Sequence, residues 1–270
     1  MLTKNYDLGN RVTAFSTMRE GGVSTGNYAS FNINHYCGDS EEHIARNLEI
    51  LSERLDIPTE NFIYPHQTHS KVVRGITQEF FSLSKAEQKE YIEGVDALTT
   101  DITGICIGVS TADCIPVLVY DPEHHCAAAI HAGWRGTVQR IVEEAVKAMA
   151  ENYGSRPESL RAAIGPGISL QSFEVGDEVY SAFLDAQFPM DKIARRFPLM
   201  NGSASNVDSQ QEKWHIDLPE CNRLQLLSCG VPAASIQLSG ICTYTDSAHF
   251  FSARKLGVAS GRIFTAIVLR

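Results

Sequence analysis

Three short apolar segments dominate the hydrophobic pattern in the central part of the chain. They are Gly104 to Val109, Ile115 to Tyr120 and Cys126 to Ile130, and each is rich in β-branched or small apolar residues. Short apolar runs bounded by polar turns are typical of buried β-strands. We therefore predict three consecutive buried strands in this region.

Chemically versatile side chains lie only at the ends of these segments. Asp113 and Cys114 separate the first segment from the second, and His131 follows the third and leads into a glycine-flanked turn at 133–136. Residues at the edges of neighbouring strands can meet in space although they are distant in sequence. The pattern predicts that the thiol of Cys114 and the imidazole of His131 lie close together.

The flanking segments show the periodicity of further helices and strands. Helices are predicted from near Glu41 to before Pro58, at Ser84 to Tyr91, along Val138 to Met149, after Phe173 to Val179, and at Pro219 to Cys229. Strands are predicted at Val12 to Thr17, on both sides of a bend within Asn61 to Gly75, and at Arg161 to Ile164, Trp214 to Asp217, Ile241 to Thr245 and Ile263 to Leu269. The polar region 194–213 is predicted to be a mobile insertion.

Composition and charge limit the classes of protein to which the chain can belong. The 270 residues carry a formal net charge of −9 with a pI near 5.5, which argues against broad electrostatic binding of nucleic acid or of an anionic membrane. No linker, repeat or apolar run long enough to span a bilayer is found. Seven scattered cysteines without CxxC spacing are typical of free thiols in a reducing compartment. We therefore expect one compact domain, residues 1–270, in the cytoplasm.

The histidines and cysteines are compatible with more than one kind of site. A catalytic zinc site usually has three protein ligands and one open position, and Cys114, His131 and one of His66 or His69 would provide them. Alternatively, Cys114 and His131 would form the thiolate–imidazole pair of a hydrolase, oriented by Asp113. In a third interpretation all of these side chains belong to the core and to turns. The residues alone do not decide among the three.

Several motifs, taken in order along the chain, resemble those of a known family. They are Thr111-Ala112-Asp113-Cys114-Ile115-Pro116-Val117, His131-Ala132-Gly133-Trp134-Arg135-Gly136, Gly165-Pro166, Phe173-Glu174-Val175-Gly176 and Phe250-Phe251-Ser252-Ala253-Arg254. Together they resemble the YfiH-like laccase-domain family, and the segments Arg19 to Ser24 and Phe31 to Asp39 look like its N-terminal motifs. The similarity spans nearly the whole chain.

The resemblance implies a fold, an activity and a cofactor. The implied fold is α+β, with mixed β-sheets packed centrally and flanking α-helices. The implied activity is phosphorolysis of adenosine, inosine and methylthioadenosine to a base and ribose 1-phosphate, together with adenosine deaminase activity. Zinc is the implied cofactor, and purine nucleosides and phosphate are the implied partners of a monomer.

Two alternative activities accompany these expectations. The older family description, a copper-dependent polyphenol oxidase or laccase, would make copper the cofactor. That chemistry needs many histidines clustered around several coppers, whereas this chain has nine histidines in all. The second alternative is a Cys-His hydrolase that edits peptidoglycan precursors, since members are also described as peptidoglycan-editing factors.

The resemblance also assigns roles to particular residues. The family's first metal ligand is the histidine of a Gln-x-His motif, here Gln67-Thr68-His69, so the implied ligands are His69, Cys114 and His131. These three residues and Asp113 form the expected catalytic set.

Candidate substrate and phosphate contacts follow from the same comparison. Arg135 is the first candidate to contact phosphate, followed by Arg19 and Arg254, and His66, beside the ligands in the sequence, is a further candidate for this substrate- and phosphate-binding group. The chain departs from the family pattern at 36–39, where a histidine common in members is displaced to His35. We therefore transfer no role to that histidine.

Overall fold

The central strands form two β-sheets that pack face to face. The computed structural model describes residues 2–198 and 212–270. The first sheet contains, in spatial order, β1 (Thr3–Tyr6), β2 (Val12–Thr17), β14 (Ile263–Leu269), β6 (Cys106–Thr111) and β3 (Phe62–Ile63). The second contains β13 (Ile236–Leu238), β9 (Arg161–Ile164), β7 (Ile115–Asp121), β8 (Cys126–Ala132), β5 (Ala97–Thr100) and β4 (Val73–Ile76). Both sheets mix parallel and antiparallel pairs.

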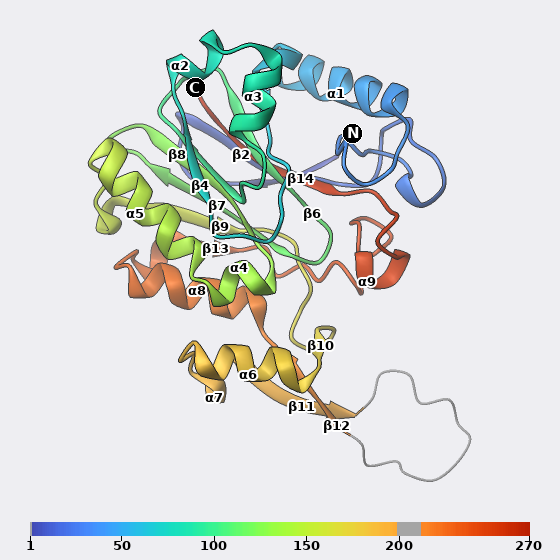
Figure 1. Ribbon diagram of the computed structural model, residues 1–270, viewed down its shortest axis with the longest axis vertical. Helices are drawn as coiled ribbons and strands as arrows, with labels where there is room; N and C mark the ends of the chain where they lie inside the picture. The colour runs from blue at the N-terminus through green and yellow to red at the C-terminus, as the bar shows by residue number, and fades with distance from the viewer. Residues whose placement is uncertain (1, 199–211) are drawn as a thin grey trace.

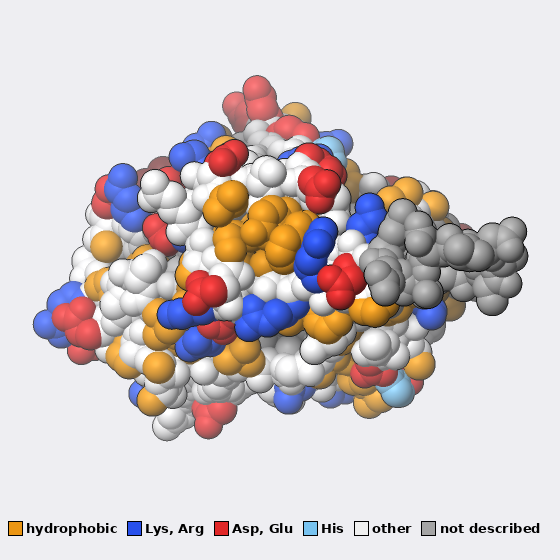
Figure 2. All heavy atoms as spheres, turned by 90° about the horizontal axis from the view of Figure 1, so that it is seen from below, with side chains coloured by type: hydrophobic (Ala, Val, Ile, Leu, Met, Phe, Trp, Pro, Cys, Tyr) orange, Lys and Arg blue, Asp and Glu red, His pale blue; other side chains and the backbone are white. Residues whose placement is uncertain are grey.

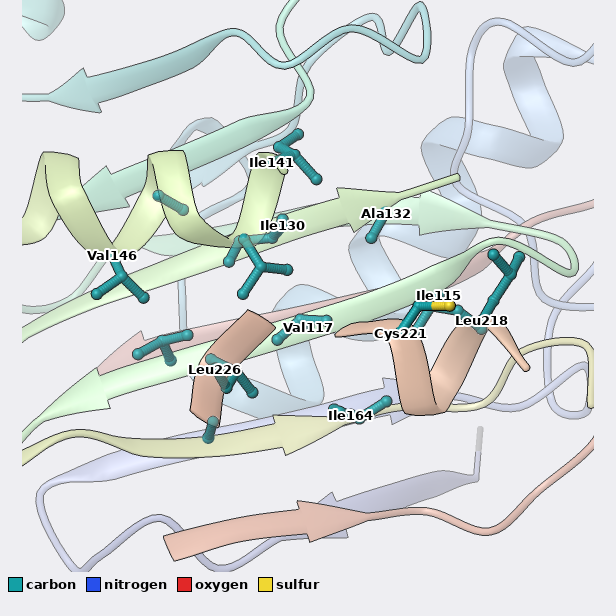
Figure 3. Close-up of a cluster of buried hydrophobic side chains, with 14 of the residues drawn as sticks. Ile115, Val117, Ile130, Ala132, Ile141, Val146, Ile164, Leu218, Cys221 and Leu226 are labelled. Atoms are coloured by element: carbon teal, nitrogen blue, oxygen red, sulfur yellow. The ribbon is translucent and has the colours of Figure 1, made fainter. Parts of the chain in front are cut away.

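The central segments are continuously apolar because successive side chains of each strand point to opposite faces of the sheet and both faces are buried. In β7, Leu118 and Tyr120 point into the space between the two sheets, whereas Ile115, Val117 and Val119 point to the opposite face. That opposite face is covered by helices, as Figure 3 shows for Ile115 and Val117 beside Leu218 and Leu226. Strands that are buried on both faces carry apolar residues at every position.

Helices cover the outer faces of both sheets and complete four layers (Figure 1). α1 (Glu41–Leu55) packs on the five-stranded sheet, and α5 (Ile141–Tyr153) and α8 (Leu218–Ser228) pack on the six-stranded sheet. The shorter helices are α2 (Gln78–Ser82), α3 (Lys85–Tyr91), α4 (Trp134–Val138), α6 (Asp177–Asp185), α7 (Met190–Ile193) and α9 (Ala253–Leu256). The α+β fold expected from the sequence is therefore confirmed.

A small lobe extends from one end of these layers. It consists of α6, α7 and a three-stranded antiparallel sheet with the order β10 (Glu174–Val175), β12 (Glu212–Ile216) and β11 (Ala194–Pro198), at the bottom of Figure 1. Figure 2, viewed from that side, shows apolar side chains gathered near the middle of the face with Lys, Arg, Asp and Glu around them. Within the lobe, Tyr180 stacks on Trp214 with ring centroids 4.1 Å apart.

Two connections cross from one sheet to the other at the same end of the molecule. The β3–β4 connection leaves the five-stranded sheet after Ile63 and joins the six-stranded sheet at Val73. The β6–β7 connection makes the same crossing between Thr111 and Ile115. These crossings carry His69 and Cys114, respectively.

Some predictions of local structure are wrong. Residues 241–245 form turns rather than a strand, because Gly240 (φ 67°) redirects the chain and only Cys242 forms an isolated bridge, to Gly167. Ala194–Pro198, expected in the mobile insertion, is strand β11, and residues 199–211 of that prediction lie outside the described residues. The helix expected over 138–149 is divided at Arg140 (φ 65°).

Candidate metal site and cavity

His69, Cys114 and His131 come together at the end of the two sheets. His131 lies in β8 and Cys114 directly precedes β7, and these strands pair so that Ile115 lies opposite Ala132. The crossing connection adds His69, whose Nε2 is 3.7 Å from the Sγ of Cys114. One potential ligand atom from each of the three residues lies within 4.8 Å of the others. This group could hold a metal ion.

The loop that carries His69 is fixed by Gln67. The side-chain amide of Gln67 donates to the carbonyl of Ser110 (2.8 Å) and accepts from its N–H (2.7 Å), so it pairs with β6 as a strand would. This anchoring holds His69 in the left-handed region at φ 62°, a conformation that costs a non-glycine residue roughly 1–2 kcal/mol. The Gln-x-His spacing therefore has a structural reason: the glutamine places the histidine.

Asp96 orients the site, although the sequence analysis gave it no role. Its carboxylate is fully buried and accepts the Nδ1–H of His131 at 2.6 Å, which leaves Nε2 of His131 free for a metal. The same carboxylate accepts the backbone N–H groups of Thr68, His69 and Ser70. One buried side chain therefore positions both histidines.

The thiol and the imidazole stabilise each other's charged forms. Burial acts to raise the pKa of Cys114, but the positive charge of His131 and hydrogen bonds from His131 and His69 lower it to about 6. Burial acts to lower the pKa of His131, but the charge of Cys114 and the hydrogen bond to Asp96 raise it to about 9. A thiolate is also the form of cysteine that binds metals.

Gly133 leaves the space into which two of the donors fit. A Cβ atom added there would lie 2.6 Å from Cδ2 of His69 and 3.1 Å from Sγ of Cys114. The backbone of Gly133 is extended (φ −67°), so its importance is steric rather than conformational. The donor set, the oriented imidazole and this space all fit a resident metal ion.

We expect Gly133→Ala to weaken metal binding by about 10-fold or more while changing the free energy of unfolding little, since the side chains that must move are the ligands themselves. The measurement is a competition titration with a chromophoric chelator. Gly75→Ala is the matched control, because a Cβ there meets nothing closer than 3.7 Å. Equal metal affinity in both variants would contradict the steric role.

The three donors lie at a cavity of about 660 Å³, a size typical of small-molecule sites. Of the other residues selected from the sequence, His66, Asp113 and Arg254 also line it. Arg19 and Arg135 are not among its lining residues. Trp134, Ile168 and Phe173 supply apolar wall.

Asp113 holds the turn before Cys114. It adopts φ 84°, and its carboxylate accepts the hydroxyl of Thr243 and the backbone N–H of Arg254, both at 2.7 Å. The carboxylate that contacts His131 is therefore that of Asp96 rather than that of Asp113.

The two arginines outside the cavity lining have other contacts. The guanidinium of Arg19 donates to the carbonyls of Ala29 and Ser247 and lies over the ring of Phe251. Arg135 is exposed and lies over the ring of Trp134, 4.5 Å from its centroid. Arg254, which the sequence ranked behind Arg135 and Arg19, is therefore the one of these three arginines that lines the cavity.

His66 forms part of the cavity rim. Its Nδ1 lies 2.6 Å from a carboxylate oxygen of Glu93, and Tyr36 stacks on its ring with centroids 4.1 Å apart. His66 is thus held by two neighbours, and it is not a member of the three-donor group.

Arg262 is a second residue that the sequence analysis missed. It immediately precedes β14 and lines the cavity together with Arg254. No motif pointed to it, because it stands alone between a serine-glycine pair and an apolar strand.

In the part of the chain that is described, no helix has both the length and the apolar character required to cross a membrane.

Two packed mixed sheets, with a His-Cys-His group that lines a cavity at one end, define an α+β protein with a candidate metal centre. Residues 13–270 match the model of the family described as multi-copper polyphenol oxidoreductase laccase. The chain belongs to this family, and the resemblance seen in the motifs is confirmed.

Named relatives extend over almost the whole chain. The purine nucleoside phosphorylase of Bacteroides thetaiotaomicron is 45% identical over 258 residues, which cover 96% of this chain and 92% of the relative. Adenosine deaminase RL5, from an unknown prokaryotic organism, is 41% identical over 256 residues, covering 95% and 93%. The crystal structure of the hypothetical protein YfiH from Bacillus licheniformis is similar with a TM-score of 0.84 at 27% identity, covering 96% and 93%.

Proposed function

We propose that this protein is a zinc-dependent purine nucleoside phosphorylase with adenosine deaminase activity. Its substrates are adenosine, inosine and methylthioadenosine, which it cleaves with phosphate to the base and ribose 1-phosphate. The observation that carries the proposal is the His69-Cys114-His131 group at a nucleoside-sized cavity. The relatives named a purine nucleoside phosphorylase and an adenosine deaminase support the reaction class.

The chain's own residues bind and orient the reactants in this proposal. His69, Cys114 and His131 hold the zinc ion, which supplies Lewis-acid activation of water or of a substrate atom. Asp96 keeps the proton on Nδ1 of His131, so that Nε2 is available as a ligand. Phe173 and Trp134 provide apolar surface against which a purine base can stack.

Two other activities are alternatives to this proposal. A Cys-His hydrolase acting on peptidoglycan precursors is favoured by the pKa of Cys114, about 6, which makes the thiol a nucleophile without a metal. A copper-dependent phenol oxidase is disfavoured, since the described residues bring together one group of three donors and multicopper chemistry needs several coppers.

The proposal includes a cytoplasmic monomer that acts on small molecules. The seven cysteines are free thiols, which suits a reducing compartment. The net charge of −9 favours small-molecule partners over nucleic acid or anionic membranes.

Product analysis tests the proposed function. The zinc-loaded protein is incubated with adenosine and with inosine, with and without phosphate, and products are separated by chromatography. We expect hypoxanthine from inosine only with phosphate, inosine from adenosine without it, and loss of both reactions after chelation. If no purine product forms while zinc stays bound stoichiometrically, the proposal is wrong. Hydrolysis of peptidoglycan precursors that survives chelation would instead support the Cys-His hydrolase.

A further inference from the structure

Two arginines line the cavity that contains the three donors. Arg254 lies in α9 and Arg262 directly precedes β14, and both line the cavity that contains the three metal-binding candidates. Val258 lies between them in sequence, lines the same cavity and is 80% exposed. The segment 253–262 therefore forms a cationic, accessible face of the site.

Both guanidinium groups are positioned by backbone carbonyls. Nη1 and Nη2 of Arg254 each donate to the carbonyl of Glu174 at 3.2 Å. Arg262 donates through Nη1 to the carbonyls of Ser260 and Gly261 (3.0 Å) and through Nη2 to that of Val258 (2.9 Å). Because carbonyls are neutral acceptors, these contacts fix the side chains without neutralising their charge.

Carboxylates do not neutralise this charge either. Among the described residues, neither Arg254 nor Arg262 takes part in a salt bridge, in contrast to Arg46 or Arg223. Asp113, the one carboxylate of the cavity lining, is occupied by the hydroxyl of Thr243 and the backbone N–H of Arg254. An acidic protein with a net charge of −9 thus keeps two positive charges together in one cavity.

We propose that Arg254 and Arg262 form the subsite that binds inorganic phosphate as cosubstrate. The inference rests on the proposed phosphorylase activity and identifies where its second substrate binds. Planar guanidinium groups suit a phosphate with several charged oxygens, and each of these two arginines keeps N–H groups, including that of Nε, beyond those that donate to the carbonyls. This assignment replaces Arg135 and Arg19 as the phosphate contacts, since neither lines the cavity.

The subsite has a defined part in the reaction. An oxygen of the bound phosphate forms a bond to C1′ of the ribose while the C1′–N9 bond breaks. The electron pair of the C1′–N9 bond leaves with the purine. A proton passes from the phosphate, directly or through water, to the purine nitrogen, so the products are the neutral base and ribose 1-phosphate. Arg254 and Arg262 hold the attacking phosphate and offset its negative charge.

Steady-state kinetics with the zinc-loaded protein test the inference. Phosphate is varied at saturating inosine, and inosine at saturating phosphate, for Arg262→Gln and Arg254→Gln. We expect KM for phosphate to rise about 10- to 100-fold, the loss typical of a charged hydrogen-bonding partner, with KM for inosine changed less than about threefold. Lys255→Gln is the matched control, because this exposed cation adjoins Arg254 but does not line the cavity.

Further variants and ligands separate the possible outcomes. Arg262→Lys should recover part of the phosphate affinity because it restores the charge, and the thermal unfolding midpoint measured without ligand reports that each variant is folded. An unchanged KM for phosphate in both Gln variants, with active wild-type enzyme, would overturn the inference while the proposed function stands.

A direct measurement of phosphate binding tests the subsite even if the wild-type enzyme shows no phosphorolysis. Protection against thermal unfolding by inorganic phosphate, present in wild type and lost in Arg262→Gln, would support the subsite although the proposed function had failed. Absence of protection in wild type would overturn the subsite too. If AMP protects through Arg262 and inorganic phosphate does not, the site binds a nucleotide phosphate and the cosubstrate assignment is wrong.

Discussion

Cys114→Ala is expected to weaken metal binding strongly and to abolish nucleoside turnover. The thiol is one of only three donors in the group, and its pKa of about 6 keeps it ionised at neutral pH. Complete zinc sites bind with roughly 10–16 kcal/mol of apparent free energy, so the loss of one ligand should cost about 100-fold or more in affinity. The measurements are metal content after dialysis and the rate of hypoxanthine formation from inosine.

Cys242→Ala is the matched control for this prediction. Burial acts to raise the pKa of Cys242, but hydrogen bonds from Ser169 and Ser172 lower it to about 7, so it is also a readily ionised thiol. It lines a different and smaller cavity and is not part of the three-donor group. Zinc content and turnover should therefore survive its removal. If Cys114→Ala keeps the zinc affinity and the turnover of the wild type, the assigned ligand set is wrong.

The candidate ligands could be selected from the sequence because each lies in a distinctive local pattern. Cys114 directly precedes β7 and His131 lies near the end of β8, and these two buried strands pair directly. The choice of His69 over His66 came from the resemblance, and the structure supplies a physical reason for it. Gln67 fixes the loop on β6, and His69 then faces Cys114 whereas His66 pairs with Glu93.

Other residues of the cavity could not be found in the same way. Asp96 is separated from His131 by 35 residues in the sequence, and a single aspartate before an apolar strand is usually a turn residue. Arg262 has no pattern of its own, and it reaches the cavity only because β14 inserts between β2 and β6 in the five-stranded sheet. Such positions depend on which strands become neighbours, and the hydrophobic pattern does not encode that choice.

The assignment of strands to sheets could not be predicted from the sequence for the same reason. The apolar run of β7 correctly predicts a strand buried on both faces, but nothing in it indicates that β6 belongs to a different sheet from β7 and β8. β11 was missed because Arg195 and Arg196 are exposed and its pairing with β12 lies outside the main core. Local periodicity therefore predicts the elements that pack in the core better than those that pair at an edge.

Asp96→Asn is expected to destabilise the protein and to weaken metal binding at the same time. Oδ1 of Asp96 accepts from His69 and His131, and Oδ2 accepts from Thr68 and Ser70. An amide NH₂ in either position would face two N–H donors, so two hydrogen bonds are lost whichever way the amide turns, although the hydroxyl of Ser70 beside Oδ2 can also accept. Breaking a buried charged network of this kind costs about 3–5 kcal/mol, and losing the partner of a ligating histidine costs about 10- to 100-fold in metal affinity.

Asp121→Asn is the control that separates the loss of stability from the loss of metal affinity. Asp121 is equally buried, and its carboxylate also binds a histidine, His124, and two backbone N–H groups, but it lies outside the metal-binding group. Urea unfolding of the metal-free proteins should show a comparable loss of stability in both variants. A competition titration with zinc should show weaker binding only in Asp96→Asn. Equal zinc affinity in the two variants would mean that Asp96 contributes only to the stability of the fold. Metal binding by His131 would then not depend on the carboxylate of Asp96.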